Sequence, residues 1–392
     1  MTDKKIPELD ILRIISILIV VVLIHIPNDY AVSFYIGLDQ YTGFLLHTSG
    51  IDVAMGSFVF ISGFGLYLNK NNRSINTLEK LSTFLKKRFL RIFPLYWIAL
   101  ILFVLFVGYS NINIIYLLAH VVGLQIIVAP LFGPPILTLW FIGIIVIYYL
   151  IFIFLSFLGS IKRIIPVSIA ILIFFAFLNM VFGLVEYRFF FYYLIFIAGI
   201  ISASIYTSPQ YNKITEKINR RKAIPFVITL CVTVISFTIY LILSEYYYIT
   251  LNLEYGTTFL QVILDQNPGI FESTFLILLL DLRILLFIIF TLSLFHFLVS
   301  ILRLIFPKRN VGTIFSLIAY STFCVYLFHR IFLIFYTVIL MDILDLAIYE
   351  RLEFNIVLLF VPFIFLFSYL IQKFSDWVLM LPSKLKMKKR VE

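Results

Sequence analysis

Charged residues are scarce in this chain. Only 13% of its 392 residues are Asp, Glu, Lys or Arg, whereas 62% are hydrophobic. Soluble domains are about 25% charged and about 45–50% apolar. Because a water-soluble fold has no interior large enough to bury so much apolar surface, lipid must solvate much of it. This scarcity excludes an ordinary soluble domain and predicts a membrane protein.

Cysteines and familiar catalytic signatures are also rare. The two cysteines, Cys231 and Cys324, each lie in an apolar run and form no CxxC or CxxH spacing, so we expect no metal site. The sequence contains no GxSxG, HExxH, GxxxxGKS, GxxxxGKT or GxGxxG pattern, and hydrolase and ATPase functions therefore lack support. The net charge of +10 comes from short basic clusters between apolar runs, so we expect no nucleic-acid partner.

Long apolar runs dominate what is present. A membrane-spanning helix needs about 20 mostly apolar residues. The runs predict an all-α, polytopic membrane helix bundle of about ten transmembrane helices, in a single domain over residues 1–392 with no appended soluble domain. The first run carries Arg13 in its first turn and lacks a small-residue cleavage site, so we expect a retained span. The predicted spans are 10–28, 50–69, 90–109, 136–159, 164–184, 188–206, 223–244, 273–302, 312–340 and 355–380.

The basic residues between these runs predict the orientation, because cytoplasmic loops carry an excess of Lys and Arg. With the N-terminus inside, the outer segments hold only Arg188 and Arg351 as basic residues, and both termini are cytoplasmic. The basic tail 384–390 is then expected to contact anionic membrane lipid. The inner segments hold Lys4, Lys5, Lys70, Arg73, Lys80, Lys86, Lys87, Arg88, Arg91, Lys162, Arg163, Lys213, Lys217, Arg220, Arg221, Lys222, Arg303, Lys308 and Arg309.

Residues 114–129 are apolar but short, and Gly133-Pro134-Pro135 follows them. A further span here would place the basic segment 213–222 outside. We therefore predict a re-entrant or surface-lying segment on the outer side of the membrane.

Six ionisable residues within the predicted spans are candidates for function, because charge inside a bilayer is costly. Arg13 can snorkel to the cytoplasmic edge or pair with Asp10, whereas His25 lies about 18 Å further along the helix, among Val, Leu and Ile. Asp281 and Arg283 point to different sides of one helix, so a partner on another helix, or a pore, is required. A packing role is as good an explanation for His25, and for the neighbours His329 and Arg330, as a chemical one.

Five short motifs follow one another over residues 8–329. They are ELDILR (8–13) leading to His25, FVFISGF (58–64), FLKKRFLRIFPLYW (84–97), LWFI (139–142) and YLFH (326–329). Together they resemble the membrane acyltransferase-3 family, which includes O-acetyltransferases of bacterial surface polysaccharides, lipopolysaccharide and peptidoglycan. About ten spans is the usual count of that family. In the second motif we expect Ser62 and Gly63 to allow close helix packing rather than to act as a nucleophile.

The resemblance implies transfer of an acyl group, usually from cytoplasmic acetyl-CoA, to a hydroxyl of a glycan or lipid-linked glycan at a cell membrane. It implies catalytic roles for His25, as base or acyl carrier, and for Arg13, which orients the donor or braces the site. Guanidinium groups can bind phosphate in bidentate fashion, which favours Arg88 and Arg91 as donor-binding residues. The remaining predicted site residues are Lys87 for the donor and His329, Arg330, Asp281 and Arg283 for the substrate.

One residue cluster and the function itself have alternative explanations. The basic cluster on the third span could reflect only the general excess of Lys and Arg in cytoplasmic segments. A transporter or flippase for a lipid-linked or acylated glycan has the same spans, with the buried charges lining a path, although we find no internal repeat. A non-catalytic family member has the same sequence features.

The chain departs from the family pattern in two places. Arg13 and His25 are twelve positions apart rather than eleven, which turns His25 by about 120° from Arg13 in a regular helix. We predict a one-residue π-bulge, or a similar local unwinding, between Ser16 and Leu23. After Trp140 the chain reads Phe-Ile-Gly-Ile without the acidic residue of many family members, so no role of that acid transfers here.

Overall fold

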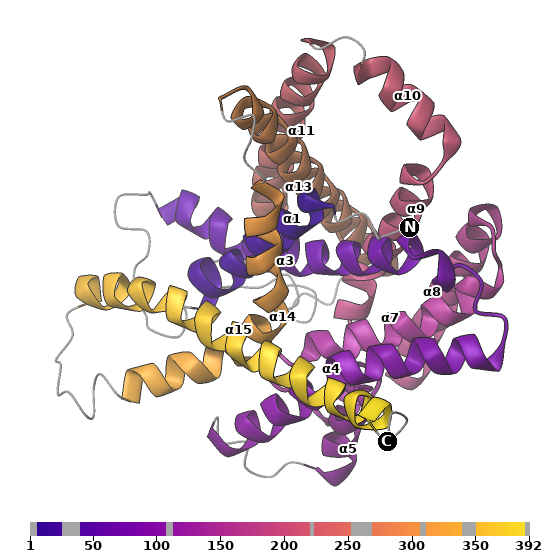
Figure 1. Cartoon of the computed structure of the whole chain (residues 1–392), viewed down its shortest axis with the longest axis vertical. Coiled ribbons are helices and arrows are strands. Elements are labelled where there is room, and N and C mark those ends of the chain that lie inside the picture. Colours follow the sequence, from indigo (N-terminus) through magenta and orange to yellow (C-terminus); the bar gives the residue numbers. More distant parts are fainter. Residues whose placement is uncertain are drawn as a thin grey trace.

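The fold is a bundle of helices, seen in a computed structural model that describes residues 6–25, 40–106, 113–219, 223–251, 269–305, 311–338 and 350–388 (Figure 1). Within these ranges there is no strand. The helices are α1 (Pro7–Leu18), the π-helix η1 (Ile19–His25), α3 (Gln40–Leu68), the 3₁₀-helix η2 (Lys70–Asn72), α4 (Leu78–Phe106), α5 (Ile114–Val122), α6 (Gln125–Phe132), α7 (Trp140–Phe157), α8 (Ile161–Phe182), α9 (Arg188–Tyr206), α10 (Pro209–Asn219), α11 (Ala223–Leu251), α13 (Ile270–Ile305), α14 (Val311–Val338) and α15 (Glu350–Lys388).

In the described part of the chain, eight helices are long and apolar enough to cross a membrane. They are α3, α4, α7, α8, α9, α11, α13 and α14, each at a predicted span. The first and last predicted spans correspond to α1 with η1 and to α15. The prediction of an all-α, polytopic membrane fold is confirmed. The ends of predicted spans 10–28, 90–109 and 312–340 lie outside the described residues, as do Lys4, Lys5, Lys308 and Arg309.

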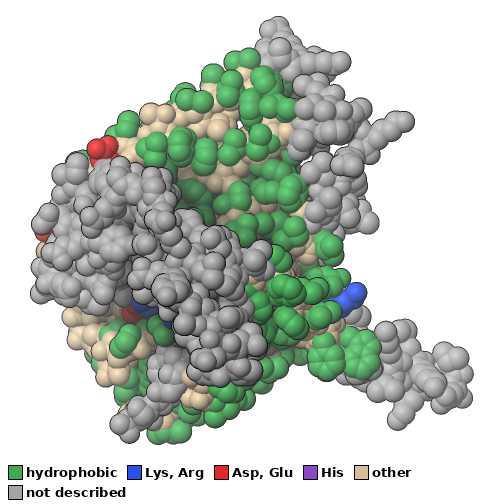
Figure 2. All heavy atoms as spheres, turned by 90° about the vertical axis from the view of Figure 1, so that its left-hand side faces the viewer, with side chains coloured by type: hydrophobic (Ala, Val, Ile, Leu, Met, Phe, Trp, Pro, Cys, Tyr) green, Lys and Arg blue, Asp and Glu red, His purple; other side chains and the backbone are tan. Residues whose placement is uncertain are grey.

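Large apolar side chains cover the outside of the bundle. Ile173 and Phe177 on α8 and Val234 on α11 are more than half exposed. Figure 2 shows hydrophobic side chains over most of the described surface in that view, with few charges among them. Water is a poor solvent for such a surface, so the bundle needs lipid around it.

The closest packing in the bundle joins α3 to α9. A Cβ atom on Gly63 of α3 would lie 2.3 Å from the carbonyl oxygen of Phe196 on α9. A Cβ on Gly199 of α9 would lie 2.3 Å from the carbonyl oxygen of Phe60 on α3. The two backbones approach because small residues in membrane helices allow it. The packing role predicted for Gly63 is therefore confirmed, whereas Ser62 lines the cavity described below.

The segment predicted to be re-entrant folds as two short helices, α5 and α6, neither long enough to be a span. Gly123 ends α5 in a left-handed conformation with φ of 75°, which glycine adopts without strain. His120 anchors this segment: its Nδ1 lies 2.9 Å from the Tyr116 carbonyl oxygen, and its Nε2 accepts a hydrogen bond of 3.1 Å from the amide of Ile136.

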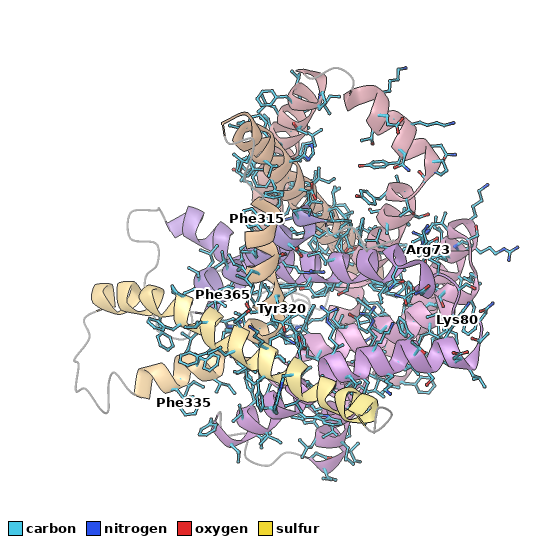
Figure 3. All side chains as sticks on the ribbon, in the orientation of Figure 1. Arg73, Lys80, Phe315, Tyr320, Phe335 and Phe365 are labelled. Atoms are coloured by element: carbon cyan, nitrogen blue, oxygen red, sulfur yellow. The ribbon has the colours of Figure 1, made fainter. Side chains whose placement is uncertain are left out.

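Two basic residues, Arg73 after α3 and Lys80 near the start of α4, mark one end of the bundle. Figure 3 shows Arg73 and Lys80 at one end and Phe335 towards the other. Arg73 closes the turn after α3, donating to the Tyr67 carbonyl at 2.8 Å and to the Thr207 hydroxyl at 3.0 Å. We call the end of the bundle that carries Arg73 and Lys80 the basic end.

The glycine contact makes a stability prediction. Gly199→Ala places a methyl group against backbone, so α3 and α9 must separate, at a cost of about 1–3 kcal/mol for overpacking. The matched control is Gly65→Ala on α3, where a Cβ meets nothing within 4 Å. Thermal melting of the purified protein in detergent should show a lower midpoint for Gly199→Ala only. Equal midpoints for both variants would contradict the close-packing argument.

The burial of His120 predicts how the stability of the fold depends on pH. Burial lowers the pKa of His120 to about 4 from its ordinary 6.5, opposed by its hydrogen bond to the Tyr116 carbonyl. The neutral imidazole thus stabilises the fold above pH 6.5, and that stability is lost as the pH falls from 6.5 towards 4. The difference in melting midpoint between the wild type and His120→Gln should shrink between pH 7 and pH 5. A difference that stays constant over this range would show that His120 does not titrate as inferred.

Candidate active site

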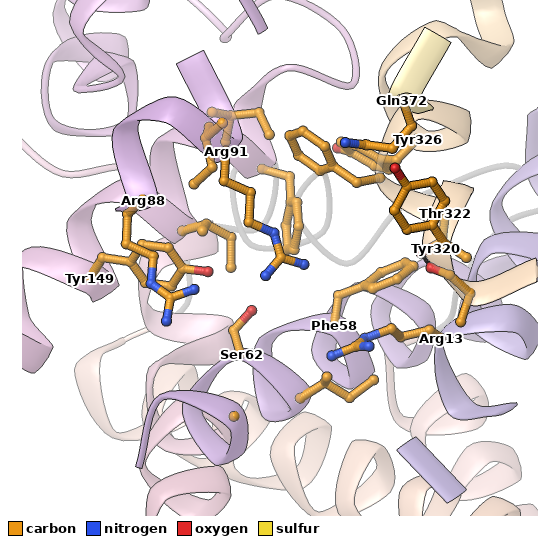
Figure 4. A pocket seen from close by; sticks show the side chains of 18 of the residues that line it. Arg13, Phe58, Ser62, Arg88, Arg91, Tyr149, Tyr320, Thr322, Tyr326 and Gln372 are labelled. Carbon is orange, nitrogen blue, oxygen red and sulfur yellow. Dashed lines mark hydrogen bonds between the residues drawn. The ribbon is translucent and has the colours of Figure 1, made fainter. Parts of the chain in front are cut away.

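A cavity of about 750 Å³ lies within the bundle, in the size range of small-molecule sites, about 300–1,000 Å³. Side chains from α1, α3, α4, α7, α14 and α15 line it. Three arginines, Arg13, Arg88 and Arg91, belong to its wall. Figure 4 shows their guanidinium groups directed into the same space, Arg13 from α1 and both Arg88 and Arg91 from α4, with Ser62 between them. The cavity is therefore strongly cationic on one side.

The arginines differ in how they are held. Arg13 donates from Nη1 to the Asp10 carboxylate at 3.0 Å, the pairing that the sequence allows for it. Arg88 lies between two aromatic rings, with its Cζ 5.5 Å from the ring centres of Phe84 and of Tyr149. Its buried Nε atom has no hydrogen-bond partner among the described residues. A guanidinium held by stacking keeps donors available for an anionic ligand.

Lys87, which the sequence analysis predicted to bind the donor, lies outside the cavity wall. Its side chain is exposed and is absent from the cavity wall, although its neighbour Arg88 on α4 is part of that wall. On a helix, adjacent positions point about 100° apart, so Arg88 and Arg91 share a face that Lys87 leaves. Of the predicted donor-binding residues, the structure brings Arg88 and Arg91 to the cavity and leaves out Lys87.

An aromatic group closes the other end of the cavity. Phe58 on α3, Phe141 on α7 and Tyr326 on α14 are the lining residues of their helices furthest from the basic end. Their ring centres lie 5.3 Å apart for Phe141 and Tyr326, 6.1 Å for Phe58 and Phe141, and 6.5 Å for Phe58 and Tyr326. These are ordinary distances for interacting aromatic pairs, about 4.5–7 Å. The cavity thus runs from arginines to aromatic rings.

The first helix changes its winding between Arg13 and His25. Regular α-helix ends at Leu18, and a π-helix covers Ile19–His25. The insertion predicted between Ser16 and Leu23 is confirmed, and it extends to His25 itself. Because a π-helix turns less per residue than an α-helix, it offsets the rotation caused by the extra residue. Both residues then face α14: Arg13 lines the cavity with Tyr320, and His25 contacts Arg330.

Beyond the aromatic end lies a buried pair of histidines. The ring centres of His25 and His329 are 4.8 Å apart, and their planes are inclined by 43°. Arg330 donates to His25 Nδ1 from Nε at 3.0 Å and lies 2.9 Å away through Nη2. His25 is 7% exposed and His329 is 0% exposed. The structure therefore brings His25 together with Arg330, which is 305 positions away in the chain, and with the adjacent His329.

Tyr326 connects the cavity to the histidines. It lines the cavity, and its ring centre is 6.3 Å from that of His329, one turn along α14. Neither histidine belongs to the cavity wall itself. The Tyr326 hydroxyl donates a short hydrogen bond to the carbonyl of Thr138, whose φ of 56° is unusual for a β-branched residue. Tyr326 is thus the side chain between the cationic cavity and the imidazole pair.

Asp281 and Arg283 lie in a different part of the core. Both are almost fully buried on α13, and neither lines the cavity. The partner that the sequence required on another helix is Ser244 of α11, which accepts from Arg283 Nε at 3.3 Å. Both carboxylate oxygens of Asp281 are buried without a hydrogen-bond partner among the described residues. Asp281 and Arg283 therefore lie apart from both the cavity wall and the histidine pair described above.

The structure also adds residues that the sequence reasoning missed. Asp376 and Gln372 on α15 line the cavity, and Asp376 accepts hydrogen bonds from Tyr320 and, at 3.0 Å, from the Gln372 amide. Asp376 lies in the predicted span 355–380, so the cost of membrane charge is a signal that could have identified it. Tyr149, which stacks on Arg88, carries no such signal because aromatic residues are common in this chain.

A comparison with protein families identifies the chain. The model of the acyltransferase-3 family, described as an acyltransferase domain, matches residues 6–373. This chain belongs to the acyltransferase-3 family. The match includes Arg13, His25, Arg88, Arg91 and His329. Searches of curated proteins and of solved structures give no match. Family and fold together make this acyltransferase a multi-pass membrane protein.

Proposed function

We propose that this acyltransferase moves a short acyl group, acetyl in the first instance, from a coenzyme A thioester to a hydroxyl of a cell-surface glycan. The observation that carries this proposal is the cavity with three arginines on its wall and a buried histidine pair beyond its aromatic end. A cationic cavity suits the phosphorylated donor, and imidazole suits proton transfer from a hydroxyl. The cell membrane is the corresponding location.

The arginine side of the cavity provides the donor site. Coenzyme A carries several phosphate charges, and guanidinium groups bind phosphate oxygens through two parallel hydrogen bonds. Arg88 and Arg91 lie one turn apart on α4, and Arg13 faces the same space from α1. Since Asp10 already neutralises part of the Arg13 charge, Arg88 is the stronger candidate for phosphate binding.

The aromatic end suits the uncharged part of the donor. Phe58, Phe141 and Tyr326 offer apolar surface to a pantetheine arm and direct the thioester towards His329. For the thioester to meet an imidazole, the Tyr326 side chain must rotate away from the Thr138 carbonyl. The uncommon backbone conformation of Thr138 supports a role for this contact as a movable barrier, since such conformations often occur at functional sites.

The acceptor approaches from the other side of the bundle. The histidine pair lies beyond the aromatic group, further from the basic end than the arginines are. If the basic end faces the cytoplasm, as the loop charges predict, a glycan or lipid-linked glycan presented at the outer surface reaches His25 and His329 without meeting the donor phosphates.

The transfer itself is the first test. Inverted membrane vesicles containing the protein are incubated with radiolabelled acetyl-CoA, and label in the glycan fraction is counted. Label should accumulate with the wild type and fall by about 10²–10³-fold in His25→Ala, whether this imidazole moves a proton or donates a hydrogen bond to the oxyanion. Expression of both proteins is compared by immunoblot. Equal labelling by the variant would remove His25 from the reaction, and no labelling by the wild type would count against acetyl transfer to a glycan.

The donor site is tested by two neighbouring substitutions on α4. Arg88→Ala should raise the apparent KM for acetyl-CoA about tenfold or more, since a charge-assisted hydrogen bond contributes roughly 1.5–3 kcal/mol. Lys87→Ala is the matched control, because that side chain is exposed and outside the cavity. Initial rates in the same vesicles over a range of acetyl-CoA concentrations give both constants. Should the two variants share the wild-type KM, the phosphates must bind elsewhere.

A further inference from the structure

The two buried imidazoles have opposite hydrogen-bonding character, which can be read from their neighbours. His329 Nδ1 lies 3.0 Å from the carbonyl oxygen of Val325 and 2.9 Å from that of Tyr326. Because both neighbours are acceptors, this nitrogen carries the hydrogen. The lone pair of neutral His329 therefore resides on Nε2. That atom is buried and has no hydrogen-bond partner among the described residues.

His25 has the reverse arrangement. Its Nδ1 accepts from the guanidinium of Arg330, with nitrogen–nitrogen distances of 3.0 and 2.9 Å. Arginine remains charged in proteins and has only donors to offer, so His25 Nδ1 holds the lone pair. The hydrogen of neutral His25 is then on Nε2. One imidazole of the pair presents an acceptor, and the other presents a donor.

Acyl transfer to a hydroxyl needs both of these groups at once. A base must remove the hydroxyl proton, and a donor must stabilise the negative charge that develops on the thioester carbonyl oxygen. The ring centres of His25 and His329 lie 4.8 Å apart, which places an acceptor and a donor side by side next to Tyr326. The unsatisfied Nε2 of His329 also argues for a ligand, because a buried acceptor without a partner costs stability.

We propose that His329 is the general base and that His25 is the hydrogen-bond donor to the oxyanion, an inference that rests on the proposed acyl transfer. The acceptor oxygen forms a bond to the thioester carbonyl carbon while its proton moves to His329 Nε2. His25 Nε2–H donates to the carbonyl oxygen of the tetrahedral intermediate. The carbon–sulfur bond then breaks, the electron pair leaves with sulfur, and His329 returns the proton to the thiolate.

Arg330 is the positioning residue of this arrangement, because its guanidinium selects the His25 tautomer. The same contact disfavours His25 as base or acyl carrier. For either role the Nε2 lone pair would have to be free, and the hydrogen would have to move to Nδ1, where Arg330 also donates. The geometry thus resolves an alternative that the sequence left open.

The test compares glutamine and alanine at each histidine, in inverted vesicles with radiolabelled acetyl-CoA and the endogenous acceptor. Glutamine keeps an N–H donor near the position of the imidazole Nε2, but its amide cannot take up a proton. His25→Gln should therefore retain at least tenfold more activity than His25→Ala. His329→Gln should be as inactive as His329→Ala, both about 10²–10⁴-fold below the wild type. Rescue by glutamine at position 329 and none at position 25 would overturn the assignment.

A second nucleophile shows that the His329 variants are folded. Hydroxylamine attacks thioesters as a neutral amine and needs no base, and acetohydroxamate is measured by its coloured iron complex. His329→Gln should transfer acetyl to hydroxylamine at a rate within about threefold of the wild type, whereas His25→Ala should be slow with either nucleophile. A His329→Gln variant slow with both nucleophiles would overturn the role of base. If the wild type acetylates neither acceptor, the proposed function itself fails, which is a distinct result.

Discussion

The hydrogen bonds from the Arg330 guanidinium to His25 Nδ1 are the contact on which the candidate site depends. A guanidinium inside a membrane bundle is costly unless its donors are satisfied. Here the guanidinium donates to the Nδ1 lone pair of an imidazole, which holds that ring in one tautomer. The contact also joins the first helix to α14, and it exists only because the π-helix turns His25 towards that neighbour.

Packing between other helices shapes the cavity near this contact. The glycine contact between α3 and α9 fixes one wall, and α3 supplies Phe58 and Ser62 to the cavity. The α5–α6 segment fills the space beside α4 and α7, where His120 is held between Tyr116 and Ile136. Chemistry in this protein therefore relies on side chains from many helices, each placed by packing rather than by one local motif.

Sequence reasoning reached much of this fold and part of the site. Span positions followed from apolar length, and the π-helix followed from one extra residue between Arg13 and His25. Arg88 and Arg91 were identified by their charge and by the motif that resembles the family. Lys87 was grouped with them, although helical spacing of about 100° per residue puts it on another face. The partners of His25 could not be predicted, since the pairing of distant helices depends on packing that no local pattern records.

Asp376 and Asp281 also show that the sequence does not reveal which buried carboxylates line the cavity. Asp376 gains its place at the cavity through Tyr320, which is 56 positions away in the chain. Asp281 satisfies the rule that membrane carboxylates mark functional sites, yet it lies outside the cavity with no hydrogen-bond partner among the described residues. Burial cost identifies candidates, but only the arrangement of helices decides which of them share a space.

The separation of the arginines from the histidine pair has a consequence for energetics across the membrane. In the proposed reaction, the polyanionic phosphates would be held by Arg88 and Arg91 on the basic side of Tyr326, and only a neutral acyl group would pass it. Moving one elementary charge through a potential of 100 mV involves about 2.3 kcal/mol. A neutral acyl group carries no such term, so the proposed transfer would modify the cell exterior without drawing on the voltage gradient.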